Sequence, residues 1–568
     1  MVLALLAARA VGGGQLAEEG VRAVRQAGSG HRPEFDAIVV GAGFSGLYML
    51  HLLRKLGLSM KVYEQGGGVG GTWYWNRYPG ARCDCESVYY MFSDHLSEEI
   101  LGEWTWTERY ASQPEILRYL EFVADKMGSR PDIQFNARVT AACYDATRNR
   151  WDISLEDGAT SSSRFLITAV GCLSTTSTPA FAGIDTFAGE CYHTGAWPHE
   201  GVDLSGKRVA VIGTGSTAVQ LVPEAARDAS HLWVFQRTPN YDLAGRNGPL
   251  SPEYTTQVKA DYPALWEKAR QTDFGLPYEV AERSALSFPP EDRQRIYEAA
   301  WAKGGFHMFL ETFTDLLLDR QSNDTASRFL RDKIRERVQD SAVAELLTPK
   351  DHPFLTKRPP LENGYYEAFN RDNVSLVDVR SSTIEKMTPQ GIRTSDGEYQ
   401  VDVIIFATGF DAMTGSLFGM GITGKNGRSL QAKWADGPQT YLGMTTSGFP
   451  NMFVICGPQS PSVLTNMPVT IEQNAEWIAE LIRYMREHDA DSAEATEDAE
   501  RDWVAHHNEV AAATLLPGTD SWWVGANIAG KPRTLYPYTG GLSTFRGICN
   551  QAAEHGYPGL ALTRHTVH

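Results

Sequence analysis

Two glycine-rich turns give the 568-residue chain the spacing that binds the pyrophosphate of a dinucleotide. The first reads G-x-G-x-x-G and begins at Gly41, and the second reads G-x-G-x-x-A and begins at Gly213. The first glycine permits a tight turn, the second lets the backbone approach a phosphate, and the third position packs a helix on the strand. The helix N-terminus then faces the negative charge. One such motif is a weak signal, but both copies here follow an apolar strand and open a helix.

The residue after the next strand differs in charge between the two units. In the first unit, the strand at 60–63 ends at Glu64, whose carboxylate can accept hydrogen bonds from both hydroxyls of a ribose. In the second unit, the strand at 231–236 is followed by Arg237, which we take to stand where Glu64 stood. An arginine fork matches a phosphate and binds a ribose diol poorly. The first turn therefore predicts FAD and the second NADPH; a solvated strand end and a surface arginine are the alternatives.

Three further stretches contain residue types that could act on a cofactor or substrate. Residues 187–198 read F-x-G-x-x-x-H-T-x-x-W-P and include His193. Residues 70–84 contain G-G-T-W and Y-P-G-A-R-C-D, and residues 357–360 read K-R-P-P. In isolation, His193 would more often be a structural histidine, and the two cations of the last stretch would be a charged surface.

Together these stretches resemble the signatures of the type I Baeyer–Villiger monooxygenases, and the resemblance covers residues 36 to about 531. These enzymes are FAD- and NADPH-dependent flavoproteins. The resemblance implies that the chain uses NADPH and O2, through a C4a-peroxyflavin, to convert a ketone into an ester or lactone. A cyclic or bulky ketone is expected, although the motifs do not identify it.

The resemblance also implies roles for residues at matching positions. Arg358 is expected to be the active-site arginine, because a permanent cation can stabilise a developing anion, and Asp84 is expected to orient it. His193 is expected to coordinate the two nucleotide domains rather than touch substrate. The expected FAD contacts are Gly41, Gly43, Phe44, Ser45, Gly46, Glu64, Gly71, Thr72, Trp73, Asp84, Tyr90, Val139 and Met467, with Asn466 beside them. The expected NADP contacts are Arg82, Cys83, Asp84, Gly213, Thr214, Gly215, Ser216, Thr217, Ala218, Gln220, Arg237, Thr238, Lys357 and Trp522.

The elements that must position these residues predict an α/β fold. We expect two Rossmann-like dinucleotide-binding domains, for FAD and NADP, with a helical insertion in the NADP domain. Alternating apolar residues at 133–171 predict an antiparallel excursion that returns to the first sheet at 166–170. Helices are expected at 112–126, 254–270, 290–301, 306–318, 326–338 and 469–488. The predicted segments are an N-terminal extension (1–33), the FAD domain (34–175 and 401–568), the NADP domain (176–239 and 351–400) and the insertion (240–350).

Composition argues against several other classes of protein. The formal net charge of −17 and the pI near 5.3 disfavour nucleic acid or an anionic membrane as a partner. Seven cysteines form neither a disulfide framework nor a metal cluster, so a cytoplasmic setting and no metal are expected. No apolar run reaches the roughly 18–20 residues of a membrane span, and the apolar start lacks the basic leader of a secretion signal. Residues up to about 31 predict a loose extension or a short amphipathic helix.

Three other functions stay open. An N- or S-oxidising flavin monooxygenase shares both turns, but its linker resembles F-x-G-x-x-x-H without the tail formed here by Thr194, Trp197 and Pro198. A non-catalytic nucleotide-binding scaffold is disfavoured by the presence of Arg358, and an NADPH oxidase would release peroxide instead of ester. The oligomeric state does not follow from the sequence, and a monomer is favoured.

Overall fold

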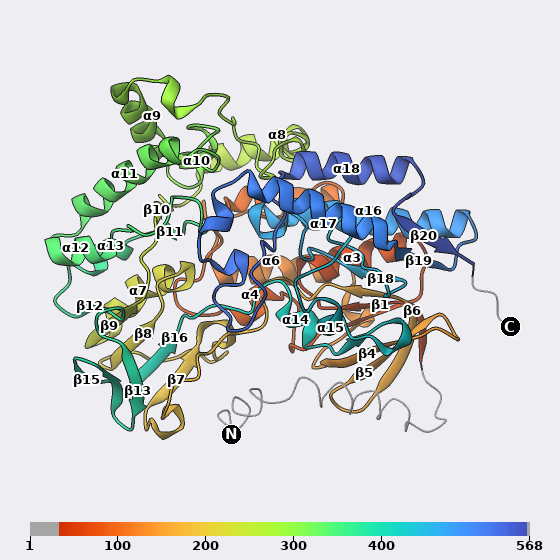
Figure 1. The fold of residues 1–568 in the computed structure, drawn as a ribbon, viewed down its shortest axis with the longest axis horizontal. Helices are drawn as coiled ribbons and strands as arrows, with labels where there is room; N and C mark the ends of the chain where they lie inside the picture. Colours follow the sequence, from red (N-terminus) through yellow and green to blue (C-terminus); the bar gives the residue numbers. More distant parts are fainter. Residues whose placement is uncertain (1–32, 565–568) are drawn as a thin grey trace.

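The computed structural model describes residues 33–564, so the predicted N-terminal extension lies outside them except for its last residue. Figure 1 shows two sheet-containing regions side by side, with helices of the predicted insertion above the second sheet and C-terminal helices above the first. Within residues 33–564, no helix has the length and apolar character required to cross a membrane.

The first sheet is built around the first glycine turn. Its order is β17-β4-β5-β6-β1-β2-β3, and β18 pairs with β6. β1 (Glu34–Val40) is parallel to both β2 (Met60–Tyr63) and β6 (Thr160–Thr168), and its last four residues are fully buried. The predicted antiparallel excursion is confirmed, because β4 (Val139–Asp145), β5 (Arg150–Leu155) and β6 pair antiparallel in succession. The short strands are β3 (Ile133–Gln134), β17 (Ile422–Thr423) and β18 (Met452–Val454).

The second sheet contains the second glycine turn. Its five parallel strands have the order β12-β9-β8-β16-β7. Their bounds are β7 (Glu190–His193), β8 (Arg208–Ile212), β9 (His231–Gln236), β12 (Val374–Asp378) and β16 (Val403–Phe406). Beside it stands an antiparallel sheet of β13 (Ile384–Thr388), β14 (Gly391–Thr394) and β15 (Gly397–Gln400).

One predicted boundary is wrong. We placed the return to the FAD domain at residue 401, but β16 pairs with β7 and β8 inside the second sheet. The four apolar side chains of β16 are buried between these neighbours, and the chain rejoins the first sheet only at β17. An apolar run predicts a buried strand but does not name its sheet, which is why the sequence misplaced it. The other domain boundaries stay predictions.

Helices follow both glycine turns and make up the insertion. α3 (Phe44–Lys55) and α7 (Ser216–Asp228) begin directly after the turns. The insertion contains α8 (Pro252–Gln271), α9 (Pro290–Lys303), α10 (His307–Leu310), α11 (Arg320–Arg337) and α12 (Ser341–Leu347). The helix predicted at 306–318 ends at Leu310. Beyond it the backbone bonds to a neighbouring loop instead, since the Thr314 N–H donates to the carbonyl of Arg283 at 3.0 Å and the Asp315 carboxylate accepts the Ala285 N–H at 3.0 Å.

The C-terminal part covers the first sheet with long helices. α16 (Met467–Glu487) packs against α3 and against α18 (Leu542–Glu554), and the predicted helix at 469–488 is thereby confirmed. The remaining helices are α4 (Thr72–Trp75), α5 (Glu98–Glu103), α6 (Gln113–Lys126), α13 (Tyr365–Ala368), α14 (Gly415–Phe418), α15 (Leu430–Lys433) and α17 (Glu497–Ala512). Two small pairings complete the fold: β10 (Leu243–Ala244) with β11 (Leu361–Glu362), and β19 (Ser492–Ala495) with β20 (Leu560–Thr563).

Candidate active site

Both glycine turns are enforced by a neighbouring strand in the same way. A Cβ atom on Gly41 would lie 2.4 Å from the carbonyl oxygen of Ala169, and one on Gly213 would lie 2.4 Å from that of Ala407. Both glycines also have positive φ angles, +108° and +116°. The helices that follow carry no acidic residue in their first turn, so their N-termini can face a phosphate. The two units therefore repeat one phosphate-binding geometry.

Glu64 lies at the end of β2, beside the first turn. Its side chain is 4% exposed, and its two carboxylate oxygens accept the N–H groups of Ala42 and Gly66, each at 2.7 Å. Burial raises the pKa of this carboxyl, and the backbone donors lower it in part. Each oxygen keeps a lone pair beyond these bonds, so the carboxylate can still accept ribose hydroxyls.

The strand register corrects the predicted equivalence of Glu64 and Arg237. The Gly41 N–H donates to the carbonyl of Tyr63 in the first unit, and the Gly213 N–H donates to that of Phe235 in the second. Gln236 is therefore the counterpart of Glu64, and Arg237 is one residue farther on and exposed. The Gln236 side chain is buried and donates to the carbonyl of Leu346 at 2.8 Å. The second unit thus has a neutral amide where the first has a carboxylate, so a phosphate is not repelled there, although the predicted residue at this position was Arg237.

Lys357 joins Arg237 at this end of the second unit. Burial lowers the pKa of Lys357, and the positive charge of Arg237 contributes to the same shift. The Lys357 ammonium donates to the backbone carbonyl of Asp520 at 2.8 Å. This bond ties the cation to the segment that contains Trp522. The predicted neighbours of the NADP 2′-phosphate therefore lie together.

Arg358 forms a two-point ion pair with Asp84. Its Nε and Nη2 donate to the two carboxylate oxygens at 2.6 and 2.8 Å, and Nη1 donates to the carbonyl of Val463 at 2.7 Å. The Phe306 ring lies 5.3 Å from the guanidinium carbon. The side chains of Arg358 and Asp84 are only 17% and 23% exposed, and the charge of Asp84 raises the pKa of Arg358 against its desolvation. Arg358 therefore stays cationic at any working pH.

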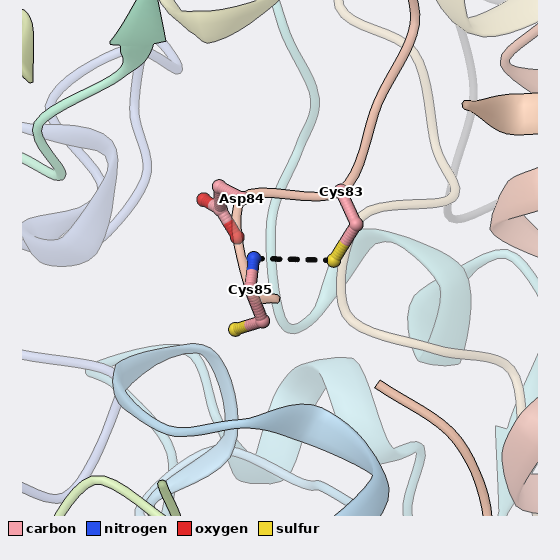
Figure 2. Close-up of side chains that lie close together, drawn as sticks. All are labelled: Cys83, Asp84 and Cys85. Carbon is pink, nitrogen blue, oxygen red and sulfur yellow. Dashed lines mark hydrogen bonds between the residues drawn. The ribbon is translucent and has the colours of Figure 1, made fainter. Parts of the chain in front are cut away.

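Two cysteines flank Asp84 (Figure 2). The Cys85 N–H donates to the Cys83 sulfur at 3.3 Å, and both thiols are buried and free. Burial raises the pKa of the Cys83 thiol well above its usual range, so it remains protonated and weakly reactive at neutral pH. These contacts hold the backbone that carries Asp84.

The loop before Asp84 is fastened to α7 through Gln220. The Gln220 amide accepts from the Tyr78 hydroxyl at 2.8 Å and donates to the Arg82 carbonyl at 3.1 Å. The guanidinium of Arg82 donates to Glu108 at 2.7 Å and to the carbonyl of Tyr110 at 3.0 Å. Arg82 and Gln220, both predicted to contact NADP, thus link the first unit to the second. The guanidinium of Arg82 is already bonded to Glu108 and Tyr110 of the first unit.

Aromatic and amide side chains line the space beside the first turn. Trp73 donates to the Tyr90 hydroxyl at 3.2 Å, and Phe44 meets Tyr90 edge-on with ring centroids 5.3 Å apart. Asn466 donates to the carbonyl of Tyr89 at 2.7 Å, while its buried Oδ1 has no hydrogen-bond partner among residues 33–564. An unpaired buried oxygen indicates a ligand or water that completes it. The sequence placed Trp73, Tyr90 and Asn466 at FAD, and the structure brings them together.

The other predicted contacts are more dispersed. Val139 begins β4 and is buried in the core. Thr214 donates to the carbonyl of Thr238 at 2.8 Å, so the second turn and the end of β9 are linked. Trp522 packs against Trp523 with ring centroids 5.6 Å apart. Contacts of these residues with a cofactor stay predictions.

His193 ends β7 and is 9% exposed. Its Nδ1 accepts the N–H of Gly195 at 3.0 Å, so Nε2, which lies 3.5 Å from the Thr408 hydroxyl, carries the proton of the neutral ring. Burial lowers the pKa of His193 to about 4. A neutral histidine at the junction of β7 and β16 suits the predicted positioning role, which stays a prediction.

We expect His193 to weaken the fold as the pH falls. The unfolded histidine binds its proton near pH 6.5, whereas the folded one binds it only near pH 4. The free energy of unfolding therefore decreases as the pH falls from about 6.5 toward 4. Between pH 7.5 and pH 5.5 the free energy of unfolding should fall in both chains. The fall should be about 1 kcal/mol smaller in His193→Gln than in the parent chain. Denaturant unfolding at both pH values measures this, with the exposed His555→Gln as control. Equal pH dependence in His193→Gln and the parent would contradict the buried neutral state.

Comparisons with known proteins agree with this geometry. A family model described as flavin-binding monooxygenase-like matches residues 36–247. A Baeyer–Villiger monooxygenase of Pseudooceanicola batsensis is 43% identical over 534 residues, which cover 94% of this chain and 97% of that protein. The chain belongs to the Baeyer–Villiger monooxygenase family. Membership confirms the predicted reaction class of this monooxygenase.

Two further proteins that resemble this monooxygenase are a steroid monooxygenase and a phenazine N-monooxygenase. The solved structure of an oxidized steroid monooxygenase bound to NADP is 46% identical, with a TM-score of 0.89, and the match covers 94% of this chain and 100% of that one. This likeness confirms the predicted fold class. A phenazine N-monooxygenase of Lysobacter antibioticus is 41% identical over 534 residues, which cover 94% of this chain and 97% of that protein.

Proposed function

We propose that this monooxygenase uses FAD, NADPH and O2 to convert a cyclic or bulky ketone into an ester or lactone. The observation that carries the proposal is the Arg358–Asp84 pair. Arg358 contacts Asp84 from the first unit, Phe306 from the insertion and Val463 from the C-terminal part. A fixed cation at the meeting point of three parts of the chain is suited to stabilising an anion formed there.

The residues around the first turn fit FAD. Gly41 and Gly46 leave no room for a side chain, because a Cβ on Gly46 would lie 1.9 Å from the Gly41 carbonyl oxygen. The buried carboxylate of Glu64 would accept the ribose hydroxyls, and the unpaired oxygen of Asn466 would meet a donor of the bound group. When bound and reduced by NADPH, FAD supplies the activated oxygen.

Arg358 and Asp84 then act on the charge that develops on the ketone. Negative charge that develops on the carbonyl oxygen of a bound ketone would lie close to the guanidinium of Arg358, which would stabilise it. Asp84 holds the guanidinium plane in place through two hydrogen bonds and limits its rotation. Phe306 covers one side of the pair and excludes water, which strengthens the electrostatic attraction.

The second turn fits NADPH, and Arg237 tests this assignment. Arg237 is exposed and, within residues 33–564, has no hydrogen-bond or ion-pair partner of its own, so its fork is available to a phosphate. Arg237→Ala should weaken NADPH binding about tenfold or more and leave NADH binding unchanged. Steady-state KM values for both nucleotides measure this, with Arg501→Ala as control. An equal effect on NADPH and NADH would contradict the assignment.

An apolar wall beside Arg358 supports a bulky substrate. Phe274, Phe306 and Phe309 of the insertion form a mutual cluster with centroid separations of 5.2 to 5.7 Å. An apolar surface of this kind would suit the hydrocarbon skeleton of a bulky ketone. The similarity to a steroid monooxygenase supports the same inference.

A product assay tests the proposed function directly. The purified FAD-containing enzyme is incubated with NADPH and small cyclic, large cyclic, aryl and fused-ring ketones, and in parallel with a sulfide and an aromatic amine. We expect ester or lactone in proportion to the NADPH consumed. Sulfoxide or N-oxide without ester would contradict the ketone interpretation and favour the N- or S-oxidising alternative. Peroxide equal to NADPH, without ester, would identify an oxidase.

The proposal includes a cytoplasmic setting and small-molecule partners only. The free cysteines and the acidic composition support it. A monomer remains the favoured state, and light scattering of the purified protein tests it.

A further inference from the structure

Arg380 stands beside Arg237 at the carboxyl edge of the second sheet. β12 and β9 are parallel, and their last pair joins Asp378 to Gln236. The Val379 N–H then donates to the Gln236 carbonyl at 2.9 Å. The segments that follow β9 and β12 therefore leave the sheet side by side, the first with Arg237 and the second with Arg380.

The contacts of Arg380 aim its guanidinium at the second glycine turn. Its Nη2 donates to the Thr238 hydroxyl at 3.2 Å and to the carboxylate of Asp351. Thr238 in turn accepts from Thr214 of the turn. The Arg380 side chain is 49% exposed, and within residues 33–564 its Nε and Nη1 have no hydrogen-bond partner. One side of the fork is thus held, and the other is free to bind.

Three cations meet at this place, and the two carboxylates beside them are shared with other groups. Lys357 interacts electrostatically with both Arg237 and Arg380, while Asp351 and Asp520 are the nearby carboxylates. Asp351 is shared between Arg380 and His352, and Asp520 pairs with Arg533. Like charges held together in an otherwise acidic chain of net charge −17 favour an incoming anion. A phosphate with two negative charges would relieve this repulsion.

We propose that Arg380 is a second arginine of the 2′-phosphate site and helps to select NADPH over NADH. Arg237 and Arg380 approach the phosphate from two adjacent strands, and Asp351 and Thr238 hold Arg380 in position. This inference rests on the proposed assignment of the second turn to NADPH. It adds a specificity residue that lies more than 140 positions from Arg237 in the chain.

Binding of nucleotide fragments tests the proposal without turnover. Calorimetry on the FAD-containing enzyme compares 2′,5′-ADP, which carries the 2′-phosphate, with 5′-AMP, which lacks it. Arg380→Ala should weaken 2′,5′-ADP binding on the order of tenfold and leave 5′-AMP binding unchanged. Arg380→Lys keeps the charge but lacks the planar guanidinium, so its affinity for 2′,5′-ADP should lie between those of the parent and of Arg380→Ala. Arg371→Ala, an exposed arginine just before the opposite end of β12, is the matched control and should match the parent.

Each outcome decides one of the two proposals. Unchanged 2′,5′-ADP binding in Arg380→Ala, or an equal loss for both fragments, would overturn the role of Arg380 and leave the NADPH assignment standing. A parent enzyme that does not distinguish 2′,5′-ADP from 5′-AMP would overturn the NADPH assignment itself and this inference with it. Should Arg380→Ala fail to retain FAD absorbance, Arg380→Gln and Arg380→Lys provide the comparison.

Discussion

Arg358→Ala should lower the rate of ester formation on the order of 100- to 1000-fold, because one preorganised stabiliser of the developing negative charge is lost. Arg358 is largely buried, and its guanidinium is fixed by Asp84 and by the Val463 carbonyl. Water that enters the space left by the side chain would solvate the anion less well than the fixed cation does. NADPH should still reduce the flavin, so that NADPH consumption continues and releases peroxide.

The measurement separates these two halves of the reaction. Stopped-flow spectroscopy follows flavin reduction by NADPH, and gas chromatography follows the ester. Arg358→Lys distinguishes charge from geometry, because an ammonium supplies a point charge but cannot make the two-point contact with Asp84. Arg501→Ala, an exposed arginine paired to Asp498, is the control and should behave as the parent. Ester formation by Arg358→Ala at a near-normal rate would remove Arg358 from the mechanism.

Asp84→Ala should damage both stability and activity. It leaves the Arg358 guanidinium, 17% exposed, without its counter-ion, and breaking a buried pair from one side costs about 3–5 kcal/mol. Because this pair is partly exposed, we expect about 2 kcal/mol in the free energy of unfolding. The freed guanidinium can rotate, so ester formation should fall about 10- to 100-fold.

A double-mutant cycle checks that Asp84 acts through Arg358. If it does, Asp84→Ala should have almost no further effect on ester formation in the Arg358→Ala background. The rate of ester formation by Asp84→Asn should lie between those of Asp84→Ala and the parent, because the amide keeps one oxygen that accepts a hydrogen bond from Arg358. Denaturant unfolding and product yield are measured on all four chains of the cycle. Fully additive losses of ester formation would mean that Asp84 has a separate role.

Local patterns explain why so much of the fold could be predicted. The turns at Gly41 and Gly213 depend on a few adjacent residues, and the sequence of β5 carries apolar residues at every second position, at Trp151, Ile153 and Leu155. Helix α16 was predicted to within two residues at its start, since its apolar spacing repeats over several turns. Signals of this kind need no knowledge of distant contacts.

The register of strands and the identity of their partners could not be predicted from such local patterns. The count along β9 placed Arg237 at the position of Glu64, whereas backbone pairing puts Gln236 there. Likewise, the apolar run of β16 predicts a strand, and only its pairing with β7 and β8 assigns it to the second sheet. A shift of one residue moves a side chain to the other face of a sheet, so small errors in register change which groups meet.

The sequence by itself determined the α/β class, the two nucleotide turns, the family resemblance and the candidate roles of Arg358 and Asp84, because each depends on residue type at short spacing. Only the tertiary structure decided that Arg358 and Asp84, 274 positions apart, pair through two hydrogen bonds, and that Arg380 lies beside Thr238. Such contacts arise where strands and loops far apart in the chain pack against one another. Their geometry depends on the whole fold and not on any local pattern.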